Sequence, residues 1–262
     1  MSLLGIIELF DAAAFGDADR LAELLNGKPE LVKVRNAEGR SLLHIAAEAC
    51  QECSVSFLIS MGADVNSSDI TGSTPLHVSI FKSDTATART LLENGARIDI
   101  ENNSCQTQLH AAAASGNTEI LGLILEKFSA PDVRNKLGET PLHFAAREGR
   151  TAAAKSLVTH GADLNARDIF GWTPLHRSLM ASRTATTRYF ITKGADLNAR
   201  DRDGDTPAHL MVLEGRKNAV RMLITNGADI TIRNNEDCTP LVLAQRLFKA
   251  DVASVLCGSN VA

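Results

Sequence analysis

Histidines are the residues of this chain whose type and spacing most readily suggest chemistry. Six of the seven recur every 33 residues: His44, His77, His110, His143, His176 and His209. An imidazole can bind a metal ion or transfer a proton near neutral pH. Each of these rings, however, ends a similar tetrapeptide, such as SLLH, TPLH, TQLH or TPAH. We therefore predict a structural role, in which each ring hydrogen-bonds to neighbouring backbone and ties one segment of the chain to the next.

The cysteines and the familiar catalytic motifs indicate no site. Cys50 and Cys53 form a lone CxxC pair, whereas a zinc site needs a second pair or two histidines at suitable spacing. The sequence contains no phosphate-binding glycine loop, metalloprotease helix or nucleophilic serine motif. The prediction is a non-enzyme with no catalytic, cofactor-binding or metal-binding residues and no cofactor. An enzyme whose site is assembled across several segments stays open as a second alternative.

The 33-residue interval organises the whole chain. A second set of motifs, MGADVN, NGARID, HGADLN, KGADLN and NGADIT, runs in phase with the tetrapeptides. These residues resemble the ankyrin repeat family, whose signature is T-P-L-H-x-A at a period of about 33 residues. The resemblance implies an all-α solenoid of stacked helix–turn–helix units with protruding β-turn or hairpin tips. It also implies a single domain over 1–262 with degenerate terminal repeats, the eight repeats being approximately 6–38, 39–71, 72–104, 105–137, 138–170, 171–203, 204–236 and 237–262.

Elementary helix physics agrees with this resemblance. In the segment TPLHFAAREG the Thr140 hydroxyl can cap a helix, and Pro141 suits the first helical position, where its missing N–H costs no hydrogen bond. Gly149 is expected to end that helix, and Gly161 to end the next one in a left-handed cap. Each pair of helices buries too little surface to fold alone, so we expect stability to come from stacking.

A weaker period of three repeats lies on top of the first. TPLHVSIFKSDTATAR at 74–89 matches TPLHRSLMASRTATTR at 173–188, which a block duplication would explain. At the end of the array, Leu247 and Phe248 have no following repeat to cover them. We expect them to fold back as a cap; the alternative is that they mark a missing partner.

Charge and composition restrict the setting and the partners. Residues 1–131 carry 9 Lys and Arg against 17 Asp and Glu, whereas residues 132–262 carry 18 against 14. An acidic partner would therefore meet the C-terminal half more favourably. Five irregularly spaced cysteines favour a reducing, intracellular location, which we expect to be the cytoplasm. We also expect no signal peptide, no membrane span and a monomer. Nucleic acid is disfavoured because acids interleave with the arginines of the turns and aromatic residues are scarce.

Positions that the repeat leaves free identify a candidate binding surface. Along the first helix and beside the turn glycine, apolar and arginine side chains gather in the later repeats, a composition typical of interfaces. Arg177 also stands where other repeats place an apolar residue, so its charge needs a partner or an exit to solvent. For Trp172 the alternative is packing across the adjoining turn. The predicted partner-binding residues are Leu137, Arg147, Phe170, Trp172, Arg177, Met180 and Leu213.

The resemblance implies a non-enzymatic protein–protein interaction module, a scaffold that binds a protein partner of unknown identity through its concave helix and turn-tip face. The alternative function is an inhibitor or antitoxin-like regulator that occludes an enzyme or nucleic-acid site. The resemblance also implies a modification, because asparaginyl hydroxylases modify some members of the family. Asn66 and Asn165 match the sequence pattern of those sites.

Overall fold

The computed structural model describes residues 3–127 and 130–258. Residues 128–129, within the expected fourth repeat, and 259–262, at the end of the eighth, lie outside the described residues. The chain divides into two compact units, Met1–Ala130 and Pro131–Ala262, and each is described by itself.

Both units are built of helix pairs. In the N-terminal unit the elements are α1 (Leu3–Phe15), α2 (Ala18–Leu25), the short 3-10 helix η1 (Pro29–Lys33), α3 (Leu42–Glu48), α4 (Glu52–Ser60), α5 (Pro75–Phe81), α6 (Thr85–Glu93), α7 (Gln108–Ser115) and α8 (Thr118–Lys127). In the C-terminal unit they are α9 (Pro141–Glu148), α10 (Thr151–Thr159), α11 (Pro174–Met180), α12 (Thr184–Thr192), α13 (Pro207–Leu213), α14 (Lys217–Thr225), α15 (Pro240–Arg246) and α16 (Ala250–Gly258).

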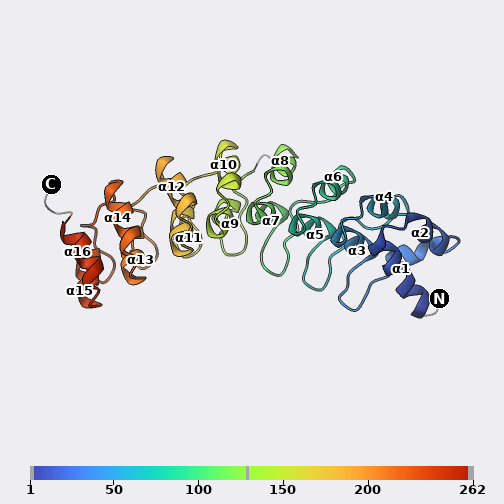
Figure 1. Cartoon of the computed structure of the whole chain (residues 1–262), viewed down its shortest axis with the longest axis horizontal. Coiled ribbons are helices and arrows are strands. Elements are labelled where there is room, and N and C mark those ends of the chain that lie inside the picture. The colour runs from blue at the N-terminus through green and yellow to red at the C-terminus, as the bar shows by residue number, and fades with distance from the viewer. Residues whose placement is uncertain (1–2, 128–129, 259–262) are drawn as a thin grey trace. The chain divides into compact units, whose positions relative to one another are not determined.

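The pairs stack in register within each unit. In the N-terminal unit the first helices α3, α5 and α7 contact one another in order, and the second helices α4, α6 and α8 do the same (Figure 1). In the C-terminal unit α9, α11, α13 and α15 stack likewise. The described residues form no strand, only an isolated bridge between Arg35 and Ser41. The predicted all-α solenoid of stacked helix units is therefore confirmed.

Small residues set how closely the first helices approach. In α9, Leu142, Ala145 and Ala146 are fully buried, and the same leucine and alanine positions are fully buried in α3 and α7. Alanine buries apolar area without holding the neighbouring backbone away, so a chain with few aromatic residues still fills its interior. Only Phe144 and Phe190 among the larger rings are fully buried within the described residues.

The repeated histidines tie each repeat to the next. In α9 the Nδ1 of His143 lies 3.0 Å from the backbone nitrogen of Thr140, so it accepts that N–H and completes a capping box. The ring's other nitrogen therefore carries the proton, and Nε2 donates to the Trp172 carbonyl, 3.0 Å away, in the following repeat. The same contact runs from His44 to Ser73 (2.9 Å), from His77 to Gln106 (3.1 Å) and from His209 to Cys238 (2.9 Å). These contacts confirm the predicted structural role for His44, His77, His143 and His209, whereas the Nε2 of His176 has no hydrogen-bond partner among the described residues.

The turn tips are joined by a second set of backbone contacts. Within each unit, a tip donates an N–H to a carbonyl of the preceding tip, as from Ile169 to Leu137 and from Arg202 to Phe170, both at 3.0 Å. The tips approach so closely that a Cβ on Gly171 would lie 3.0 Å from the Asp201 Cα. Since Gly171 also has a φ of +81°, only glycine fits this position without strain.

The expected cap at the end of the array is absent from the described residues. Leu247 is 42 % exposed and Phe248 is 93 % exposed, with a left-handed φ of 54°. The helix α15 ends at Arg246, and the chain turns at these two residues directly into α16, so neither side chain folds back over the last repeat. The expectation of a cap formed by these two side chains is therefore wrong for the described part of the chain.

Candidate partner-binding surface

Three apolar side chains form a continuous exposed strip at the turn tips of the C-terminal unit. Leu137 is 40 % exposed, Ile169 is 38 % exposed and Phe170 is 47 % exposed. The tip-to-tip hydrogen bond between Ile169 and Leu137 makes them neighbours, and Phe170 follows in the chain. We call Leu137, Ile169 and Phe170 the tip strip. Exposed apolar residues that adjoin one another are a feature of interaction sites.

Ile169 was not among the predicted site residues. It lies one position before the residues on either side of the turn glycine, from which the candidate surface was predicted. That position carries Lys136 and Arg202 in the neighbouring copies, so an isoleucine there was a usable signal.

Two other predicted residues lie at the ends of first helices. Met180 ends α11 and is half-buried, and Leu213 ends α13 and is 40 % exposed. Both belong to the edge where a first helix turns into its second helix. The described contacts place neither of them against the tip strip.

Trp172 is bonded into the framework of the turns. Its indole Nε1 donates to the Asp201 carboxylate, 3.1 Å away, in the next repeat, and its carbonyl accepts from His143. One face of the ring lies under the Arg177 guanidinium at 4.8 Å, and the ring stacks on His176 with centroids 6.5 Å apart. These contacts are those expected if Trp172 packs across the adjoining turn. The residue is nevertheless only half-buried, so part of it remains open to solvent.

Arg177 has two buried acidic partners. Its Nη2 lies 2.6 Å from Asp168 and 3.1 Å from Glu139, and these two carboxylate side chains are 0 % and 3 % exposed. The second oxygen of Asp168 accepts the backbone N–H groups of Phe170 and Trp172, at 2.8 and 2.9 Å. Arg177 therefore neutralises the carboxylate that holds the turn of the tip strip in shape.

Arg147 completes this cluster. Its guanidinium lies 4.5 Å above the buried Phe144 ring and 3.4 Å from Glu139, with Glu148 at 3.3 Å on the same helix. At 37 % exposed, it is the member of the cluster most open to solvent. We call Glu139, Arg147, Asp168 and Arg177 the ion-pair cluster.

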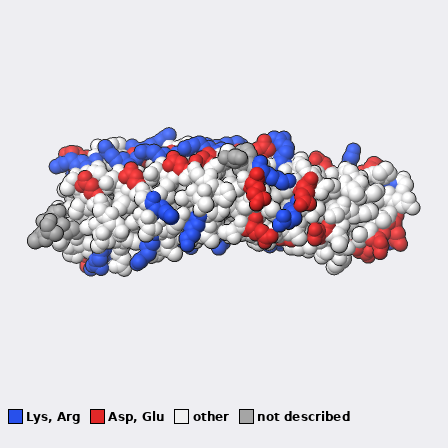
Figure 2. Space-filling model, turned by 90° about the horizontal axis from the view of Figure 1, so that it is seen from above, with Lys and Arg blue, Asp and Glu red and all other residues white. Residues whose placement is uncertain are grey.

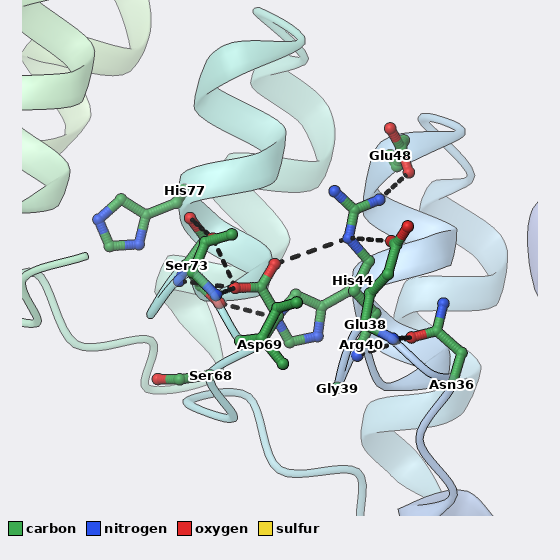
Figure 3. A network of polar contacts seen from close by, with 12 residues as sticks. Asn36, Glu38, Gly39, Arg40, His44, Glu48, Ser68, Asp69, Ser73 and His77 are labelled. Atoms are coloured by element: carbon green, nitrogen blue, oxygen red, sulfur yellow. Dashed lines mark hydrogen bonds and ion pairs between the residues drawn. The ribbon is translucent and has the colours of Figure 1, made fainter. Parts of the chain in front are cut away.

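A related network occurs in the N-terminal unit (Figure 3). Arg40 lies 2.6 Å from Glu48 and 3.6 Å from Asp69, whose carboxylate accepts from Thr71 and Ser73. Burial raises the pKa of Asp69, but the hydrogen bonds from Thr71 and Ser73 outweigh it and leave that pKa below its usual value. The carboxylate is thus ionised at neutral pH, and it needs a cation beside it.

The two networks occupy equivalent positions three repeats apart, but the arginine and the glutamate have exchanged places. Three repeats after Arg40 and Glu48, the chain carries Glu139 and Arg147, still eight residues apart and still paired. Asp168, the counterpart of Asp69, would then face Glu139 instead of an arginine. Two buried carboxylates without a cation would repel each other and lose their hydration, a cost of several kcal/mol.

The exchange explains why Arg177 interrupts an apolar position. Its counterpart three repeats earlier is Val78, which is buried. With glutamate at 139, the cation for Asp168 has to come from elsewhere, and position 177 on α11 supplies it. Arg177 is therefore a compensation for Glu139.

The other chemical candidates give no site. Among residues 3–127 and 130–258 no group of three or more His, Cys, Asp or Glu side chains is placed to hold a metal ion. Cys50 and Cys53 are exposed free thiols. Burial and the nearby Asp84 carboxylate raise the pKa of the Cys50 thiol, the opposite of what a reactive thiolate requires. The described helices include none long and apolar enough to cross a bilayer.

Stacked helix pairs with a 33-residue period, tied through TPLH histidines and joined at their turn tips, define a class of repeat protein. The family model for ankyrin repeats (three copies) matches residues 9–102, 109–201, 161–234 and 186–262. The chain therefore belongs to the ankyrin repeat family, whose members are generally protein–protein interaction modules. A comparison with curated proteins returns no significant match.

Proposed function

We propose that this protein is a non-enzymatic scaffold that binds a protein partner through the turn tips and first helices of its C-terminal unit. The observation that carries the proposal is the tip strip, in which Leu137, Ile169 and Phe170 are exposed side by side. Adjoining exposed apolar side chains are a feature of interaction sites, whereas a single exposed one, such as Ile70, is ordinary.

The ion-pair cluster supports the same surface. Through Asp168, Arg177 holds the backbone of Phe170 and Trp172 in one conformation, so the strip loses little entropy on binding. Arg147, Met180 and Leu213 supply a partly exposed cation and two aliphatic side chains on the adjoining first helices. Arginine and large apolar residues are the types that dominate binding energy in interfaces.

Capture of partners by intact protein and by two variants tests the placement. Leu137→Ser/Phe170→Ser removes exposed apolar surface, and we expect it to weaken binding by about 2 kcal/mol, or roughly thirtyfold. The matched control is Ile70→Ser, which removes a tip isoleucine that is 67 % exposed in the N-terminal unit. The affinity for each captured partner would be measured by calorimetry.

Partners held equally by all three proteins would contradict this placement. An activity assay of the captured partner separates the scaffold from the inhibitor or antitoxin-like alternative, since only an occluding protein abolishes its partner's activity.

A further inference from the structure

The second helices of the C-terminal unit carry a groove that the proposed function does not use. Two adjoining hollows of about 520 and 470 Å³ lie along α12 and α14 and share Arg188, Asn218 and Met222. We call them together the α12–α14 groove. The tip strip belongs to the turns that precede α9 and α11, whereas the groove lies along α12 and α14 (Figure 1), so the two surfaces are formed by different elements.

The groove exists because two bridging side chains are missing from it. Between α10 and α12 the gap is closed by a hydrogen bond from Thr151 to Thr186 (2.7 Å) and by the Tyr189 ring under Lys155 (5.9 Å). One repeat later, the positions of Thr186 and Tyr189 are occupied by alanine and methionine, Ala219 and Met222.

One repeat later the cation that corresponds to Lys155 is still present, although methionine replaces the tyrosine ring beneath it. Arg188 is the counterpart of Lys155, and it lines the groove without an aromatic partner. The lining contains three further cations, Arg216, Lys217 and Arg221, and no Asp or Glu. Within the described residues, Arg216 pairs with Glu214, while Arg188, Lys217 and Arg221 form no ion pair.

The second helices α12 and α14, which form the groove, and the preceding α10 share this lack of acids, whereas the next second helix, α16, carries Asp251. The described helices α10, α12 and α14 contain no Asp or Glu, whereas α2, α4, α6 and α8 of the N-terminal unit each contain at least one. Figure 2 shows Lys and Arg side chains spread over the C-terminal unit on the face drawn, with some Asp and Glu among them, and a group of Asp and Glu at the N-terminal end of the other unit. A cationic groove whose lining contains no acid attracts negative charge, although Glu214 beside it already pairs with Arg216.

The apolar residues that line the groove indicate which kind of negatively charged partner fits it. Leu179, Ile191 and Met222 contribute aliphatic surface, and no aromatic ring lines it. Single-stranded nucleic acids bind largely by stacking bases on aromatic side chains, which this floor lacks. An acidic peptide that carries an aliphatic side chain satisfies both the rim and the floor.

We infer that the α12–α14 groove is a docking site for an acidic segment of a partner protein that inserts an aliphatic side chain between the two helices. The carboxylates of the segment pair with Arg188 and Arg221 on facing helices, and its aliphatic side chain lies against Met222. This site is separate from the tip strip, so one partner can occupy both or two partners can bind at once.

The decisive variant fills the groove without changing any charge. Ala219→Thr/Met222→Tyr reproduces on α14 the side chains with which α12 closes the preceding gap. The probe is a fluorescein-labelled synthetic peptide of glutamates interrupted by leucines, and its affinity for the full chain is measured by anisotropy. We expect the filled variant to bind this peptide at least about tenfold more weakly while its melting temperature is unchanged or higher.

Further variants and probes separate the contribution of the arginines to peptide binding from that of the aliphatic side chain. Arg188→Glu/Arg221→Glu is expected to weaken the peptide at least about tenfold, against less than about twofold for Arg202→Glu, an exposed tip arginine away from the groove. A probe with serine in place of leucine should bind more weakly than the original. Leu137→Ser/Phe170→Ser, which changes only exposed side chains of the tip strip, should leave peptide binding unchanged, so a failure here is distinct from a failure of the proposed function.

Four results would overturn the inference. They are no measurable binding of the leucine-containing probe, equal binding by the filled variant, equal binding of the serine probe, and tighter binding of an oligouridylate probe that the filled variant loses. The last result would make the groove a nucleic-acid site.

Discussion

Acidification from about pH 7.5 to about pH 5 is expected to unfold this protein, because its buried histidines cannot accept protons in the folded state. Burial lowers the pKa of His77, His143 and His176 to about 4, and it lowers the pKa of His44 and His209 in the same direction. In each ring Nδ1 accepts a backbone N–H, so a proton there would break the cap of the helix that it begins.

The sign follows from where the protons bind. An unfolded histidine has a pKa of about 6.5, so below that pH the unfolded chain binds protons that the folded rings refuse. Stability is therefore complete above about pH 6.5 and is lost as the pH falls towards 4, where the folded rings titrate. One pKa unit is worth 1.36 kcal/mol, so each ring shifted to about 4 costs about 2 kcal/mol at pH 5. Three such rings remove about 6 kcal/mol, a large part of the 5–15 kcal/mol that typically stabilises a folded protein.

Urea titrations followed by far-UV circular dichroism at about pH 7.5, 6.5 and 5.5 measure this loss. His176→Gln is the informative variant, because glutamine can complete the same capping box and the Nε2 of His176 has no hydrogen-bond partner to lose among the described residues. We expect this variant to lose less stability on acidification than the wild type. His160→Gln, at an exposed histidine outside the repeated motif, is the control and should follow the wild type. Unfolding midpoints that stay constant down to pH 5 would contradict the argument.

The repeated framework was predictable because it depends on short spacings. Four residues are enough to specify the start of a first helix. Thr140 caps it, Pro141 occupies its first turn and His143 completes the capping box, as the sequence predicted. Exposure of Leu137, Phe170 and Leu213 also followed from positions that the repeat leaves free. Local sequence sufficed wherever both partners of a contact belong to the repeat itself.

The particular contacts of the candidate surface were not predictable in this way. Trp172 bonds to Asp201, 29 residues ahead, and Arg177 bonds to Glu139, 38 residues behind, so neither partner lies within the same motif. The comparison at three repeats did contain a clue, since Arg40 and Glu139 are opposite charges at one position. The α12–α14 groove could not be predicted for another reason. It results from the replacement of Thr186 and Tyr189 by Ala219 and Met222 one repeat later, and a repeat pattern shows conserved positions more readily than the loss of a side chain.

Replacement of Arg177 by valine is expected to destabilise the C-terminal unit by about 3 kcal/mol, since removing one partner of a buried ion pair leaves its acids uncompensated. Valine is what the chain itself carries at this position three repeats earlier, at Val78, so the shape of the site tolerates it. The loss would therefore come from charge: Asp168 would lose its cation while it lies beside the buried Glu139, which would keep only Arg147 at 3.4 Å. The change is measured as the free energy of unfolding in urea at pH 7.5.

A charge exchange provides the test of this explanation. Glu139→Arg/Arg147→Glu/Arg177→Val rebuilds in the C-terminal unit the arrangement of Arg40, Glu48 and Val78 in the N-terminal unit, where an arginine before the helix serves the carboxylate of the next turn. We expect the triple variant to recover at least about half of the stability that Arg177→Val alone loses, because Asp168 regains a cation. Arg202→Val, at an exposed arginine, should change stability by less than about 0.5 kcal/mol. If the triple variant were less stable than Arg177→Val, position 177 would be required for its packing against Trp172, and the compensation argument would fail.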